Sequence, residues 1–165
     1  MRVGIALGSN IGDRMANLRA ARRSIVDLVG DKSLLASSIY ETEPVDCEPG
    51  AAKFLNAVLE IEYDGDPMEL LEELIRAEES LGRKRDHARN RSRKIDMDLL
   101  YADGLEIDNE RLRLPHPRMH LRKFVLQPLV DIRPDLVLPG QIKTLSELLA
   151  ELKDSATVFR FAENW

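Results

Sequence analysis

One stretch of the sequence concentrates residues that could do phosphate chemistry. Residues 83–98 read RKRDHARNRSRKIDMD, so a basic segment runs directly into an Asp-x-Asp pair. Its basic side chains are Arg83, Lys84, Arg85, Arg89, Arg91, Arg93 and Lys94, and its carboxylates include Asp96 and Asp98. Guanidinium groups match phosphate oxygens, and Mg²⁺ is usually shared between one or two carboxylates and substrate phosphates. Since the whole chain has a net charge of −5, this positive charge is local and predicts a site for a polyphosphate with Mg²⁺.

The Asp-x-Asp pair has the spacing of two ligands on one strand face. Residues i and i+2 of a β-strand share a face and lie about 6.6 Å apart along the chain. Asp96 and Asp98 would then point the same way, while Ile95, Met97 and Leu99 would fill a core. An isolated Asp-x-Asp is more often a solvated face, but the adjoining arginines favour a cation site. Without a cation, two close carboxylates raise each other's pKa.

The basic segment has two other interpretations. Charged loops are commonly just solvated, and a local basic patch could bind RNA on an α+β sheet. RNA binding of that kind needs aromatic side chains exposed on central strands. The chain has one Trp, three Tyr and four Phe, and no strand carries such a motif. RNA binding is therefore the weaker interpretation.

Two further motifs have mainly structural interpretations. Residues 8–13 (GSNIGD) join a strand to a helix but lack the glycine pattern and the lysine of phosphate-binding loops, so we interpret them as a tight turn. His116 lies between two prolines. Its spacing to His120 would suit zinc on a helix, but the prolines and the lack of a third ligand nearby argue against that metal. With Arg118 and Arg122 nearby, His116 could instead contact phosphate, although a lone His is more often a packing or surface residue.

The bulk composition is that of a globular protein. A length of 165 residues suits one domain, residues 1–165, and 44% hydrophobic with 32% charged residues excludes a disordered chain. No apolar run approaches the roughly 20 residues of a membrane span, and the amino terminus looks like a strand and not a signal peptide. Cys47 is the only cysteine, which excludes an internal disulfide. We expect a cytoplasmic protein.

Apolar periodicity predicts alternating strands and helices. The expected strands are 3–7, 34–42, 54–63 and 94–102, with a hairpin return at 112–114 after the Asp103-Gly104 turn. The expected helices include residues 18–28 and 67–81, short pieces within 118–129, and a last helix at 145–152. The order of the first six elements is that of a ferredoxin-like split βαβ core. We therefore predict an α+β fold with a mostly antiparallel sheet, helices on one face, and the carboxyl-terminal segment on the other.

Taken together, these segments resemble the 6-hydroxymethyl-7,8-dihydropterin pyrophosphokinase family. The matching segments are GSNIGD at 8–13, YETEP at 40–44, FLNAV at 54–58, Glu78 with LGRKR at 81–85, RKIDMDLL at 93–100, LPHPR at 114–118 and RKFVLQPL at 122–129. Seven matches in the order of the family are far more specific than any one of them. The resemblance implies α/β/α layers and transfer of a pyrophosphoryl group from ATP to the hydroxymethyl group of the pterin, releasing AMP, in folate biosynthesis.

The resemblance also implies roles for individual residues. Asp96 and Asp98 would hold two Mg²⁺ ions and, with Arg83 and Arg93, would be catalytic. The ATP-binding residues would be Glu78, Arg83, Arg85, Arg93, His116 and Arg122. The pterin-binding residues would be Phe54 and Phe124 on the two faces of the ring, Asn56 at its edge, and Thr42 and Val45 through the backbone. Expected partners are ATP and a reduced pterin, with no nucleic acid or membrane, for a monomer or weak dimer.

One departure from the family pattern falls within the basic segment. Many members carry Trp-Gly-Pro before the arginine that matches Arg93, whereas this chain has Asn90, Arg91 and Ser92. The missing Trp removes apolar cover from a loop that closes over the substrates. Closure could then depend on phosphate contacts, the enzyme could be slower, or the chain could be an altered nucleotide-binding relative with a different substrate or none.

Overall fold

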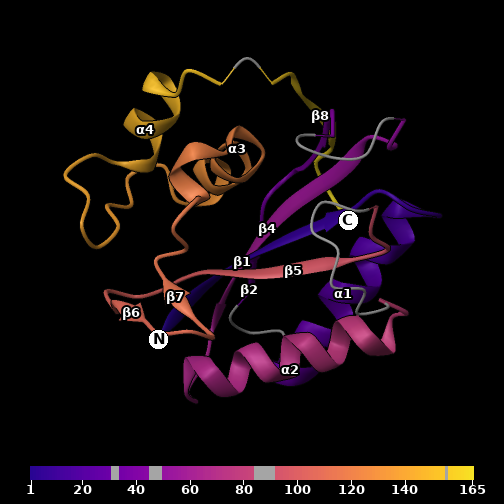
Figure 1. Cartoon of the computed structure of the whole chain (residues 1–165), viewed down its shortest axis with the longest axis horizontal. Helices are drawn as coiled ribbons and strands as arrows, with labels where there is room; N and C mark the ends of the chain where they lie inside the picture. The colour runs from indigo at the N-terminus through magenta and orange to yellow at the C-terminus, as the bar shows by residue number, and fades with distance from the viewer. Residues whose placement is uncertain (31–33, 45–49, 84–91, 155) are drawn as a thin grey trace.

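The computed structural model describes residues 1–30, 34–44, 50–83, 92–154 and 156–165 (Figure 1). Its elements in chain order are β1 (Arg2–Ser9), α1 (Arg14–Val29), β2 (Leu34–Ala36), β3 (Ile39–Thr42), β4 (Phe54–Glu62), α2 (Pro67–Ser80), β5 (Asp96–Ala102), β6 (Ile107–Asp108), β7 (Arg113–Leu114), the 3₁₀ helix η2 (Met119–Leu121), α3 (Lys123–Ile132), α4 (Leu145–Glu151) and β8 (Val158–Ala162). Among these, no helix has the length and hydrophobicity to cross a membrane.

The main sheet is antiparallel, in the order β5-β1-β4-β3-β8, with β2 also paired to β4. Strand β1 thus lies between β4 and β5 in the sheet. Along the chain, α1, β2 and β3 separate β1 from β4, and α2 separates β4 from β5. This is the split βαβ arrangement expected from the sequence, and the prediction of an α+β fold is confirmed.

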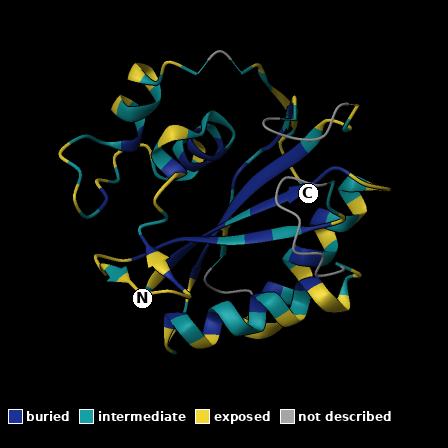
Figure 2. Cartoon of the chain, viewed as in Figure 1, coloured by how far each residue is buried: buried dark blue, intermediate teal, exposed yellow. Residues whose placement is uncertain are grey.

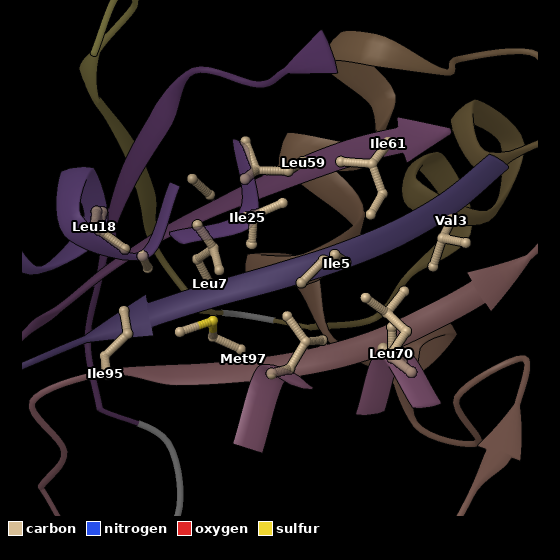
Figure 3. Close-up of a cluster of buried hydrophobic side chains, with 14 of the residues drawn as sticks. Val3, Ile5, Leu7, Leu18, Ile25, Leu59, Ile61, Leu70, Ile95 and Met97 are labelled. Carbon is tan, nitrogen blue, oxygen red and sulfur yellow. The ribbon is translucent and has the colours of Figure 1, made fainter. Parts of the chain in front are cut away.

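Both faces of the sheet are covered by helices (Figures 1 and 2). On one face, alternate residues of β1, such as Val3 and Ile5, pack with Leu18 of α1 and Leu70 of α2 (Figure 3). On the other face, the strands contribute a second cluster that includes residues of α3 and α4, among them Leu126 and Leu145. The carboxyl-terminal segment therefore covers the second face, as the sequence predicted, and β8 adds an edge strand.

The first two helices begin at capping carboxylates that the sequence makes available. Asp13 accepts a hydrogen bond from the backbone N–H of Ala16 (2.9 Å), and Asp66 accepts one from Met68 (2.7 Å). Pro67 occupies the first turn of α2, where a missing N–H has no cost. These caps satisfy donors that would otherwise be unpaired at the helix ends.

One expected strand and one expected hairpin are wrong in detail. The expected strand 34–42 is two strands, because Ser37 leaves the regular ladder and its hydroxyl accepts the N–H of Val58 (2.9 Å). The expected hairpin return at 112–114 does not pair with β5. Instead β7 pairs with β6 in a separate two-stranded sheet, with Leu114 opposite Ile107. Local alternation could predict neither outcome, because both depend on hydrogen-bond partners set by tertiary contacts.

A buried polar network fixes the far end of α3 to the sheet. Glu60 is 4% exposed and accepts hydrogen bonds from the hydroxyl of Tyr101 (2.7 Å) and from Arg133, at the carboxyl end of α3. Burial raises the pKa of Tyr101, so it remains a neutral donor. Phe124 lies in the first turn of the same ten-residue helix, at the end away from this network.

Candidate active site

The two carboxylates at the start of β5 lie on the face turned toward α3. Asp96 and Asp98 both line one cavity, while Ile95, Met97 and Leu99 are buried in the opposite cluster, as the spacing predicted. Loss of solvent, and then the negative charge of Asp96, raises the pKa of Asp98 to about 6 against the opposing effect of nearby arginines. Such a pair of close carboxylates favours a cation or a ring of guanidinium groups beside it.

Two arginines of the basic segment contact Asp96. Arg83 Nη1 lies 2.7 Å from Asp96 Oδ1, and Arg93 Nη1 forms an ion pair with Asp96 Oδ2. Each carboxylate oxygen of Asp96 therefore has a guanidinium partner. The two arginines approach from opposite ends of the basic segment, and the structure thus brings together three of the four predicted catalytic residues around one carboxylate.

Glu78, in the last turn of α2, contacts both Arg83 and the backbone of β5 next to this cluster. It is 5% exposed, pairs with Arg83, and accepts the backbone N–H of Met97 at 2.6 Å. Burial raises the pKa of Glu78 to about 7; the charge of Arg83 lowers it in part, and Asp96 raises it further. Glu78 therefore joins α2 to β5 at the point between the two aspartates.

The cavity beside the carboxylates has the lining of a site for a flat heterocycle. Its residues are Ala6, Leu7, Gly8, Thr42, Glu43, Phe54, Asn56, Ala57, Arg93, Asp96, Asp98, Leu100, His116, Arg122, Phe124 and Val125. Phe54 is the first residue of β4 and Phe124 lies in the first turn of α3, so a strand and a helix each supply one aromatic ring to the lining. Asn56 Nδ2 donates to Thr42 Oγ1 at 2.8 Å, and both side chains are buried. Aromatic walls with a few fixed polar groups are typical of small-molecule sites.

A second hollow adjoins the first one on the other side of Asp98 and His116. It is lined by Leu71, Asp98, Leu99, Asn109, Glu110, Arg111, Leu112, Arg113, His116 and Pro117. Because both hollows share Asp98 and His116, two ligands could meet at these side chains. This second hollow was not predicted from the sequence, since its walls come from α2, β5 and the segment that forms β6 and β7.

His116 is held in a defined orientation between the hollows. Its backbone N–H donates to the carbonyl of Leu100 (2.7 Å), and its Nδ1 accepts the N–H of Arg118 (3.1 Å). An accepting Nδ1 places the proton of the neutral ring on Nε2, which becomes a donor. Burial, and then Arg122, lowers the pKa of His116, which favours this neutral form. Arg122 also lies over the ring of Phe124, 5.6 Å from its centroid.

The side chains around Asp96 and Asp98 suit the metal that the sequence predicts. Asp96 and Asp98 offer oxygen ligands on one face, and the described residues contain no group of three or more His, Cys, Asp or Glu side chains that could hold an ion. Mg²⁺ is usually bound through one or two carboxylates and substrate phosphates, so two carboxylates in a cavity that Arg93 and Arg122 also line fit it.

Two predicted site residues cannot be placed. Arg85 and Val45 lie outside the described residues, as do Lys84, Arg89, Asn90 and Arg91 of the basic segment. The other predicted residues that line the first cavity are Thr42, Phe54, Asn56, Arg93, Asp96, Asp98, His116, Arg122 and Phe124. Arg83 contacts Asp96, which lines this cavity, and Glu78 contacts Arg83.

Sequence comparison decides the family. Residues 4–134 match the family described as 7,8-dihydro-6-hydroxymethylpterin-pyrophosphokinase. The chain belongs to this family. It is 39% identical over 150 residues to 2-amino-4-hydroxy-6-hydroxymethyldihydropteridine pyrophosphokinase of Haemophilus influenzae, which covers 91% of this chain and 92% of the relative. It is 45% identical over 128 residues to the protein of the same name from Bacillus subtilis, which covers 78% of this chain and 75% of the relative.

Solved structures agree with the fold. An HPPK-DHPS protein crystallised with substrates superposes with a TM-score of 0.70 at 14% identity, over 90% of this chain and 44% of that one. The chain thus spans less than half of that solved chain. Family membership confirms the predicted enzyme class, a pyrophosphokinase of folate biosynthesis, and does not favour the RNA-binding alternative. Enzymes of this family use ATP with Mg²⁺.

Proposed function

We propose that this pyrophosphokinase transfers the β,γ-pyrophosphoryl group of ATP to the hydroxymethyl oxygen of 6-hydroxymethyl-7,8-dihydropterin, releasing AMP, as one unit formed by residues 1–165. The observation that carries the proposal is the meeting of two hollows at Asp98 and His116, beside the arginine cluster on Asp96. Two substrates placed on either side of these residues would have their reacting groups at the carboxylates.

The first cavity suits the pterin. Phe54 and Phe124 would cover the two faces of the ring. Because the amide nitrogen of Asn56 is used by Thr42, its Oδ1 is the atom turned toward the space above Gly8, where a Cβ atom would lie 3.2 Å away. An amide oxygen fixed in this way is an acceptor for the N–H groups along the edge of a pterin. The backbone of Thr42 was expected to contact the pterin. We propose that its side chain also acts indirectly, because its hydroxyl orients the amide of Asn56.

The second hollow suits the adenosine part of ATP. It continues from His116 along Leu71 and Leu99, which supply apolar walls, to Arg111 and Arg113. The triphosphate would then lie between the hollows, where Arg83, Arg93 and Arg122 supply cationic groups and Nε2 of His116 supplies a neutral donor. We propose Glu78 as the group that orients Arg83 toward these phosphates.

The reaction needs in-line placement and charge neutralisation more than covalent help from the protein. The hydroxymethyl oxygen forms a bond to the β-phosphorus, the bond from that phosphorus to the α,β-bridging oxygen breaks, and AMP leaves. The hydroxyl proton passes to Asp98 or to solvent. Asp96 and Asp98 would hold two Mg²⁺ ions, which supply Lewis-acid stabilisation of phosphate charge when bound. Before phosphate contact, Arg83 and Arg93 must release Asp96 and turn to phosphate oxygens.

The direct test is AMP formation from ATP and Mg²⁺ with and without the pterin. We expect AMP to form only with the pterin, and to fall about 100-fold or more in Asp96→Ala and Asp98→Ala, by analogy with the loss of a group that stabilises transition-state charge. Asp64→Ala, at an exposed position before α2, is the matched control and should retain activity. Nucleotide binding without pterin-dependent turnover would support the altered relative instead. Near-normal turnover of both site variants would refute the role of the carboxylates.

A further inference from the structure

The turn after β1 contains a buried residue, Asn10, whose side chain forms hydrogen bonds with distant segments of the chain. Asn10 is 3% exposed, and its side-chain amide has three partners. Its Oδ1 accepts the backbone N–H of Arg93 at 2.6 Å. Its Nδ2 donates to the carbonyl of Ala52 at 3.3 Å and to Ser92 Oγ at 3.2 Å. In addition, the backbone N–H of Asn10 donates to the carbonyl of Arg93 at 3.0 Å, so both backbone polar groups of Arg93 are held by one residue.

These contacts require an amide at position 10. The Arg93 N–H can only donate, and the Ala52 carbonyl can only accept, so the side chain between them must carry one acceptor and one donor. Asp supplies the acceptor and lacks the donor, and Ala supplies neither. Because the site is buried, a missing partner leaves an unsatisfied polar group that water cannot easily reach.

The turn itself is anchored to α1 and to the chain after Arg93. Ser9 Oγ donates to the carbonyl of Lys94 (2.6 Å) and accepts from Asn17 Nδ2 (3.1 Å). Asn17 lies in the first turn of α1 and also donates to the carbonyl of Ile11 (2.8 Å). The backbone around Asn10 is therefore held by hydrogen bonds to α1 and to the chain after Arg93.

We propose that Asn10 is a positioning residue, which sets the backbone from which Arg93 reaches the reacting groups and ties it to the segment that leads into Phe54. Asn10 does not line either hollow that meets at Asp98, so it acts through its neighbours. Arg93 is one of those neighbours and pairs with Asp96. Ala52 is the other, two residues before the ring of Phe54 in the pterin cavity. The inference rests on the role proposed above for Arg93.

Three single variants separate the contacts of Asn10. Asn10→Ala removes all side-chain bonds and should lower kcat about 100-fold, as expected for a displaced catalytic group, and raise the pterin KM. Asn10→Asp keeps an acceptor for Arg93 and loses the donor to Ala52. It should therefore raise the pterin KM with a smaller loss in kcat. Ser92→Ala, the matched control, removes one of the three contacts and should change both constants less than about threefold.

A double-mutant cycle distinguishes a positioning role of Asn10 from a purely structural one. It compares the effect of Asn10→Ala on kcat in the presence and absence of the Arg93 side chain. Asn10→Ala is measured in the wild type and in Arg93→Ala, at a temperature below the thermal transition of every variant. If Asn10 acts on kcat through Arg93, its loss should cost about 100-fold in the wild type and little in the Arg93→Ala background. Should Asn10→Ala fail to fold, Asn10→Leu takes its place in the cycle, because it has nearly the same size and also lacks the acceptor for Arg93.

The possible results test three claims separately: the role of Asn10, the role of Arg93 and the proposed reaction. An equal loss of kcat in both backgrounds, or a lower thermal midpoint with unchanged kcat and KM, would overturn the role of Asn10. A normal kcat for Arg93→Ala alone would overturn the role proposed for Arg93 and leave the enzyme activity standing. No pterin-dependent AMP from the wild type would overturn the proposed reaction itself.

Discussion

Glu78 should make the protein less stable as the pH rises, although its carboxylate has an arginine partner. Burial raises its pKa from 4.5 to about 7, so the folded chain binds this proton more tightly than the unfolded chain. Between these two pH values the native state binds more protons than the unfolded state. The free energy of unfolding therefore decreases as the pH rises through this interval. The full interval corresponds to about 3 kcal/mol, from about 1.4 kcal/mol for each tenfold change in proton affinity.

The change that tests this is Glu78→Gln, which has nearly the same shape and keeps an oxygen for the N–H of Met97. Unfolding free energies from urea titrations are measured at pH 5 and pH 8 for both proteins. Wild-type stability should fall between these pH values by about 2–3 kcal/mol more than that of the variant. Asp98, whose pKa is raised to about 6, adds to the fall in both proteins and cancels in the comparison. Glu79→Gln, at an exposed neighbour on the same helix, is the control.

Equal pH dependence of the wild type and Glu78→Gln would refute this reasoning. It would mean that the pairing with Arg83 outweighs burial, so that the carboxylate stays ionised in the fold over the whole interval. A steeper fall in the variant would have the opposite sign and would be equally decisive.

Two further predictions concern ligand affinity. Gly8→Ala places a methyl group 3.2 Å from Asn56 Oδ1 at the floor of the first cavity, and should raise the pterin KM about tenfold, or about 1.4 kcal/mol, with little change in kcat. An unchanged KM in steady-state assays of AMP formation would show that the pterin does not use this space. Arg83→Ala removes one of the two guanidinium partners of Asp96, both partly exposed, and should tighten Mn²⁺ binding without nucleotide about threefold. Weaker Mn²⁺ binding by electron paramagnetic resonance would exclude this competition.

The sequence predicted the parts of the site that depend on one element at a time. Period-two alternation was enough to place Asp96 and Asp98 on one face and Met97 in the core, because a strand imposes that alternation wherever it lies. The capping signal at Asp66 and the apolar stripe of α2 were local in the same way. Helix α2 was expected to end at residue 81 and ends at Ser80.

What the sequence could not predict depends on elements that meet only in the fold. The contact of Glu78 with the backbone of Met97 requires α2 to pack beside β5. The role of Asn10 was missed for the same reason, since its partners lie 42 and 82–83 positions away. A signal was nevertheless present. Asn10 follows Ser9, at the end of an apolar strand, and polar residues buried at such a place need partners from elsewhere in the chain.

Strand β1 packs in the core with one face and borders the first cavity with the other because its residues alternate in size. Val3, Ile5 and Leu7 fill the core under α1 and α2, while Gly4, Ala6 and Gly8 face α3. At Gly4 the missing side chain admits the ring of Tyr101, which a Cβ atom would approach to 2.2 Å.

At Gly8, four positions along the strand, a Cβ atom would meet only Asn56 Oδ1 at 3.2 Å and Phe54 at 3.8 Å, the groups that border the first cavity. The space above Gly4 is filled by the protein itself, so a larger residue there must displace an internal ring and cost stability. The space above Gly8 borders the cavity proposed for the pterin, so a larger residue there would compete with that proposed ligand. Glycine on the same strand face thus admits an internal ring at Gly4 and leaves space at the border of the first cavity at Gly8.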